Sequence, residues 1–91
     1  MNKSELIRSL SDKSMIPLEE ASMIVNIVFD AMKATIHNGG RVEIRGLGSF
    51  KLKNYSGYTG RNPKTGKTVS VQPKRLPFFR AGKEFKTFLN T

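Results

Sequence analysis

The sequence predicts an α+β fold in one small domain over residues 1–91, with a helical first half and a β-rich second half. Apolar residues recur at helical spacing between Leu18 and Ile36. On either side of Gly46-Leu47-Gly48 they alternate instead with charged residues, which is the pattern of half-buried strands. We therefore expect a helical half in residues 1–40, a β-hairpin in 41–53, an arm in 54–74, and a return strand with a last helix in 75–91.

Two helices are expected in the first half. Asn2 can cap the first, and Glu5 three residues on completes a pattern typical of a capping box. Pro17 suits the first turn of the second helix, and Asn38-Gly39-Gly40 can end it. The apolar face of this second helix is too wide for the first helix alone to cover, so a partner subunit is indicated.

The return strand and last helix close the domain. Pro77 lacks a backbone donor, which indicates an edge strand or an irregular stretch. A helix is expected after Gly82, and its apolar residues should leave the end of the chain packed against the core: Phe85, Phe88 and Leu89.

Charge divides the chain as sharply as the expected secondary structure does. Residues 1–43 carry five basic and six acidic side chains, whereas residues 44–91 carry eleven basic and one acidic. A basic surface is often only a solvated face, but this one is segregated, which favours a polyanionic partner. Nucleic acid is favoured over an anionic membrane because no amphipathic helix carries the charge.

Several classes of site and location are disfavoured. The chain has no cysteine and a single histidine, His37, so neither a metal site nor another cofactor is expected. No apolar stretch reaches the length of a membrane span and the N-terminus lacks a signal-peptide core, so we expect a cytoplasmic protein. No catalytic constellation is visible, and an enzyme is not expected.

The polar segment 59–68 predicts the tip of the arm. Asn62-Pro63 can start a turn and Gly66 can supply left-handed backbone geometry. The segment nearly matches a phosphate-binding loop, but Arg61 stands where the first glycine is required, and no helix can follow. A small-molecule nucleotide substrate is therefore disfavoured, whereas a basic ribbon can follow a nucleic-acid groove.

Three motifs together resemble the bacterial HU and integration host factor family: Gly46-Leu47-Gly48-Ser49-Phe50, the tip Thr59-Gly60-Arg61-Asn62-Pro63-Lys64-Thr65-Gly66, and Phe79-Arg80-Ala81-Gly82-Lys83. The resemblance covers essentially the whole chain. It implies an intertwined dimer with a helical base and two β-ribbon arms that enter the minor groove of duplex DNA and bend it. Nucleoid association, nucleoid organisation and the assembly of nucleoprotein complexes are the implied roles.

The resemblance also implies functions for individual residues. Pro63 would insert between base steps, and Arg61 and Asn62 would lie in the minor groove. The remaining implied DNA-binding residues are Thr59, Gly60, Lys64, Thr65, Gly66 and Lys67 near the tip, and Lys3, Arg45, Lys53, Lys74, Arg75, Arg80, Lys83 and Lys86 on the body and arm base. The implied dimer core contains Phe29, Leu47, Phe50 and Phe79.

The sequence departs from the family pattern in places. Leu47 stands where phenylalanine is usual, and Tyr55 and Tyr58 stand where arginine is common, which puts mid-arm phosphate contacts in doubt. These tyrosines are the only stacking candidates for an alternative function, non-bending binding of RNA or single strands.

Arg45 bears on the choice of partner and of binding site. Together with Ile16-Pro17 it resembles the β subunit of integration host factor, which implies sequence preference and a heterodimer with a related subunit. A homodimer with little sequence preference is the competing interpretation, with Arg45 then a solvated strand residue.

Overall fold

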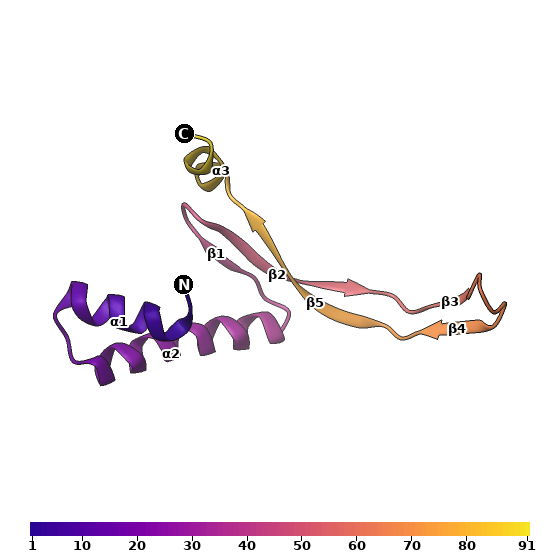
Figure 1. Cartoon of the computed structure of the whole chain (residues 1–91), viewed down its shortest axis with the longest axis horizontal. Helices are drawn as coiled ribbons and strands as arrows, with labels where there is room; N and C mark the ends of the chain where they lie inside the picture. The colour runs from indigo at the N-terminus through magenta and orange to yellow at the C-terminus, as the bar shows by residue number, and fades with distance from the viewer. The chain divides into compact units, whose positions relative to one another are not determined.

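The computed structural model describes residues 1–91, which divide into two compact units, Met1–Thr35 and Ile36–Thr91. The α+β fold predicted from the sequence is confirmed (Figure 1). None of the helices combines the length and apolarity that crossing a membrane requires. In chain order the elements are α1 (Lys3–Ser14), α2 (Leu18–His37), β1 (Val42–Ile44), β2 (Gly48–Tyr55), β3 (Tyr58–Arg61), β4 (Thr68–Val71), β5 (Lys74–Ala81) and α3 (Lys83–Leu89).

The first unit contains α1 and most of α2. The predicted cap is present, since the Asn2 side chain accepts a hydrogen bond of 2.9 Å from the Glu5 backbone N–H. Helix α1 ends at Met15, which adopts left-handed backbone geometry at φ 54°. The connection to α2 is closed by Ser11, whose hydroxyl donates to the Ile16 carbonyl at 2.6 Å and whose carbonyl accepts from the Ile16 N–H.

Few side chains of this unit are buried. Ala21 and Val25, one turn apart on α2, are the only residues of the chain that are buried. Other apolar residues of α2 remain open, including Ile27 at 62% exposure and Val28 at 51%. An apolar face wider than α1 can cover was predicted from the sequence, and the structure confirms it.

The second unit is built on a three-stranded antiparallel sheet in the order β1-β2-β5. Phe50 on β2 lies opposite Phe79 on β5, and their ring centroids are 4.7 Å apart. Pro77 lies on β5, which pairs only with β2 in this sheet, so the predicted edge strand is confirmed. Gly48 has φ +156°, and a Cβ there would meet the Arg80 carbonyl and lie 2.9 Å from the Phe79 ring. Only glycine therefore fits where β2 begins.

Helix α3 starts beside the β1–β2 turn, where the Gly82 N–H donates to the Leu47 carbonyl at 3.0 Å. The expectation that its apolar residues would pack the end of the chain is wrong for the chain by itself. Phe85 is half-buried, but Phe88 is 73% exposed and Leu89 63% exposed. The spacing correctly predicted an apolar helix face, yet a seven-residue helix turns much of that face away from its own sheet.

Candidate nucleic-acid interface

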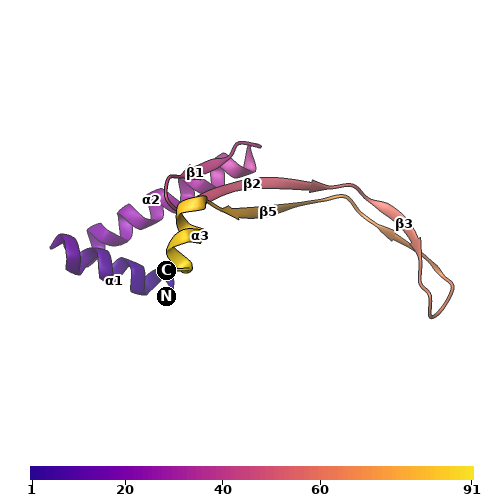
Figure 2. The same ribbon diagram turned by 90° about the horizontal axis from the view of Figure 1, so that it is seen from above.

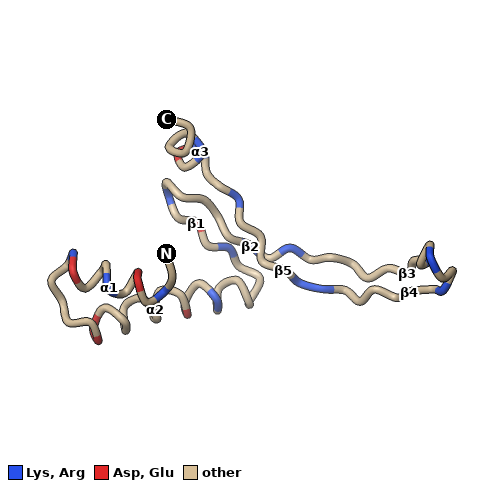
Figure 3. Tube along the Cα trace, in the orientation of Figure 1, with Lys and Arg blue, Asp and Glu red and all other residues tan.

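The arm is a second, two-stranded sheet. Strands β3 and β4 pair antiparallel from Tyr58 opposite Val71 to Arg61 opposite Thr68. The ribbon continues beyond β2 and β5 and turns out of their line (Figure 2). Basic residues lie at its tip, whereas no acidic residue lies on it (Figure 3). A ribbon with only two strands buries little of itself and leaves its side chains available to a ligand.

The tip has the turn chemistry expected from its sequence. The Asn62 side chain accepts from the Lys64 N–H at 2.9 Å, two residues on, and the Asn62 carbonyl accepts from the Gly66 N–H at 2.7 Å. Gly66 has φ +72°, the left-handed geometry predicted for it. A bond of 2.8 Å from the Asn62 N–H to the Lys67 carbonyl closes the loop. This network fixes the backbone on both sides of Pro63, which is itself exposed at the apex.

The two faces of the arm differ in polarity. Because side chains alternate along a strand and the pairing register is known, each face can be assigned. One face carries Tyr58, Val69 and Val71 around the bare backbone of Gly60. The other face is polar and presents Thr59, Arg61, Thr68 and Ser70.

A short break separates the arm from the main sheet. Residues 56–57 and 72–73 belong to neither sheet. Gly57 is pressed against the opposite strand, and a Cβ there would lie 2.6 Å from the Val71 carbonyl oxygen and 2.8 Å from Pro73 Cδ. Tyr55 and Tyr58 consequently belong to different sheets, on either side of this break.

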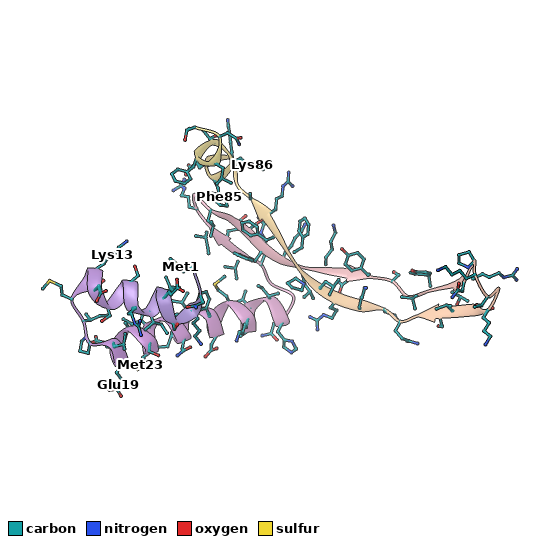
Figure 4. All side chains as sticks on the ribbon, viewed as in Figure 1. Met1, Lys13, Glu19, Met23, Phe85 and Lys86 are labelled. Carbon is teal, nitrogen blue, oxygen red and sulfur yellow. The ribbon has the colours of Figure 1, made fainter.

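An open cleft of the second unit brings together four of the proposed DNA-binding cations. It lies between the β1–β2 turn and the start of α3. Lys86 on α3 is one of the residues that line it (Figure 4). Two carboxylates, of Glu43 and Glu84, also line the cleft. The cations and the hydroxyl residue that line it are Arg45, Arg80, Lys83, Lys86 and Ser49.

Ser49 and Lys51 were not predicted from the sequence as DNA-binding residues; Ser49 lines the cleft, whereas Lys51 does not. Both lie on the outer face of β2, together with Lys53, because they share its strand parity. The signal was present in the alternation of Lys51 and Lys53 with Phe50 and Leu52.

Arg75 and Lys3 are not among the residues that line the cleft. The Arg75 guanidinium donates to the His37 carbonyl at 2.7 Å, so this side chain caps the C-terminal end of α2. An arginine has five donors and can bind a further acceptor while it holds this one. Lys74, the first residue of β5, is exposed, and Lys3 is the first residue of α1 in the other unit.

The cations of the basic half have no acidic partners. The ion pairs of the chain are Lys33 with Asp30, at 4.0 Å, and Arg41 with Glu43. All four of these residues lie before residue 44, so none of the eleven basic side chains of residues 44–91 forms an ion pair within the chain. Unpaired, exposed cations along a ribbon and a cleft are suited to a polyanion.

Comparisons with known proteins agree with this geometry. The chain is 44% identical over 87 residues to integration host factor subunit β of Haemophilus influenzae, covering 94% of this chain and 93% of that protein. It is 42% identical over 91 residues to the same subunit of Pseudoalteromonas atlantica, covering 99% and 95%.

Solved structures give the same result. The Anabaena HU–DNA cocrystal structure superposes with a TM-score of 0.83 at 29% identity, covering 98% of this chain and 97% of that one. HU from Thermotoga maritima shares the fold, with a TM-score of 0.66 at 22% identity over 98% of each chain. Residues 1–90 match the family described as bacterial DNA-binding protein. The chain therefore belongs to the bacterial DNA-binding protein family of HU and integration host factor.

Proposed function

We propose that this protein is an architectural DNA-binding protein that grips duplex DNA through the minor groove and bends it. One observation carries the proposal: a two-stranded ribbon ends in an exposed, backbone-fixed Pro63 surrounded by cations without acidic partners. Such a tip can insert an apolar wedge between base steps while charges on either side hold the phosphates. Organisation of the nucleoid and assembly of nucleoprotein complexes follow as its roles.

The tip residues have two roles: one residue bends the DNA and the others bind the groove and the phosphates. Pro63 is the wedge, because its ring is rigid and apolar. Arg61 and Asn62 lie in the groove beside it, and Lys64 and Lys67 meet phosphates. The neighbouring residues shape the turn and leave the backbone close to the groove: Thr59, Gly60, Thr65 and Gly66.

The body supplies further phosphate contacts. Arg45, Arg80, Lys83 and Lys86 line the cleft between the β1–β2 turn and α3. Together they form a positive site that suits a phosphate of the bent duplex. If the protein pairs with a related subunit and prefers certain sequences, Arg45 is the residue expected to supply that preference; in a homodimer with little preference it is a solvated strand residue. The other body contacts are Lys3, Lys53, Lys74 and Arg75.

The working form is a dimer in which residues 1–91 of each chain form one domain. Two buried side chains cannot stabilise a chain of this length, so its open apolar surface has to be covered. Phe29, Leu47, Phe50 and Phe79 contribute to that shared core, and all four are incompletely buried in the single chain. The partner is a second copy of this chain or a related subunit.

The protein acts without catalysis, in the cytoplasm, associated with the nucleoid. The alternative of a single-strand or RNA binder needs a platform on which bases stack. Tyr55 and Tyr58 lie in separate sheets, across the break at residues 56–57, so they do not form one continuous platform. Membership of a DNA-binding family also supports duplex DNA over that alternative.

Competition binding tests this function. Labelled duplex DNA is titrated with the purified protein at several salt concentrations, with unlabelled duplex, single strand and RNA as competitors. We expect duplex to compete best and affinity to fall steeply with salt. Preference for single strands, or salt-independent binding, would contradict the proposal. Sedimentation of the same sample distinguishes a homodimer from a chain that dimerises only with an added related subunit.

A further inference from the structure

Phe78 does not belong to the aromatic pair that its neighbour Phe79 forms. The pairing register places Phe79 opposite Phe50 and Phe78 opposite Lys51. Neighbouring residues of a strand point to opposite faces, so Phe78 lies on the outer face of the sheet, with Lys51 and Lys53. The ring therefore stands on the charged face of the sheet and away from the apolar one.

The ring is held in place yet remains open. The Lys53 ammonium lies 4.4 Å from the Phe78 ring centroid, a cation–π contact. Phe78 is nevertheless 36% exposed, and Leu76, two residues earlier on the same face, is 41% exposed. We call Leu76 and Phe78 the outer apolar strip. The cations that share this face of the sheet are Lys51, Lys53, Lys74 and Arg80.

The charges around the strip indicate what covers it. A second copy of the chain docked face to face would bring four cations against the same four cations, which is repulsive. Duplex DNA presents phosphates at intervals with apolar deoxyribose faces between them. An apolar strip among cations matches that alternation, because the cations can meet phosphates while the strip meets sugars.

We infer that Phe78, together with Leu76, contacts the deoxyribose groups of bound duplex DNA. The inference rests on the proposed function and extends it, because it adds a residue that supplies affinity without charge. A neutral ring displaces no counterions, so its contribution persists at salt concentrations that weaken the phosphate contacts. Phe78 is thus an uncharged contact residue on the body of the protein, beside the cations that bind phosphates.

Binding measurements across a salt series separate this contribution from that of a cation. Phe78→Ala is expected to weaken duplex binding roughly tenfold at every salt concentration with the slope retained. Lys53→Gln is expected to lower the slope of log affinity against log salt by roughly one. Met15→Ala, which removes an exposed apolar side chain from the first unit, is the control and should bind as the unchanged protein does. Wild-type affinity in Phe78→Ala would overturn the inference.

Hydroxyl-radical footprinting tests the sugar contact itself, because the radical reports the exposure of deoxyribose. At saturating protein, Phe78→Ala should lose protection of sugars under the body while protection by the arms persists. An unchanged footprint would overturn the inference even if affinity fell. If Phe78→Ala does not fold, Leu76→Ala on the same strip decides by the same footprint. Failure of the unchanged protein to bind any duplex would instead overturn the proposed function, and this inference with it.

Discussion

The helical unit buries only two side chains and the arm buries none, and the two regions expose different kinds of surface. On α2 several open residues are large and apolar, and Met23, 58% exposed, is one of them (Figure 4). On the arm the turn residues are polar or basic, and the apex is a single proline. Exposure alone therefore does not identify a partner, whereas the chemistry of the exposed atoms does.

The difference assigns one kind of partner to each region. Open apolar surface is stabilised by burial against another protein chain, which the dimer supplies. Unpaired cations are stabilised by phosphates, which a duplex supplies. Two apolar features lie among the exposed cations, the outer apolar strip and Pro63, and in the proposed complex they would meet the apolar sugars and base faces of DNA.

The strongest test of this comparison places a charge on the helical surface. Val28→Asp should abolish the dimer, because an unpaired carboxylate at a covered interface costs roughly 3–5 kcal/mol in each subunit. Val28 is 51% exposed in the single chain, so a self-sufficient monomer would tolerate the change. Sedimentation and thermal unfolding measure it. Met15→Asp is the control, since Met15 is 91% exposed with backbone geometry that aspartate accepts.

The base and the tip of the ribbon can be compared through two glycines with positive φ. Gly48→Ala should destabilise the folded protein by roughly 3 kcal/mol, because backbone strain adds to a clash with Arg80 and Phe79. Gly66→Ala meets no atom within 4 Å and carries only the strain, about 1 kcal/mol. Chemical denaturation measures both. Equal losses of stability in the two variants would contradict the close packing around Gly48.

The smallest expected effect concerns one cation of the arm. Lys64→Ala should flatten the salt dependence of duplex binding by roughly one unit and weaken all sequences about equally, since a phosphate contact carries no sequence information. The measurement is the affinity for two unrelated duplexes over a salt series. Lys33→Ala, which removes an exposed lysine paired with Asp30, is the matched control. An unchanged slope would remove Lys64 from the interface.

Much of the fold could be predicted from local chemistry. The cap at Asn2, the second helix from Leu18, the glycine hairpin and the Asn62 turn each depend on residues close together in sequence, and the structure confirms them. The cations of the candidate interface stand out in the sequence as a group, whereas the roles expected of individual body cations came from the family resemblance. Their segregation from acids is visible without coordinates.

The features that sequence did not reveal depend on tertiary pairing. Strand alternation places Phe78 and Phe79 on opposite faces, but only the register with β2 shows that Phe79 lies opposite Phe50 and Phe78 opposite Lys51. The bond from Arg75 to the His37 carbonyl joins residues 38 positions apart, and no local pattern predicts it. The exposure of Phe88 and Leu89 was missed because an apolar helix face does not say which chain covers it.

In the proposed function the arm bends DNA by inserting Pro63, and circular-permutation mobility shifts measure that bend. A duplex bound at its centre by the unchanged protein should migrate more slowly than one bound near its end. Pro63→Ala should reduce that difference while retaining most of the affinity, because the cations still hold the phosphates. Mobility independent of site position, or full bending by Pro63→Ala, would contradict the account.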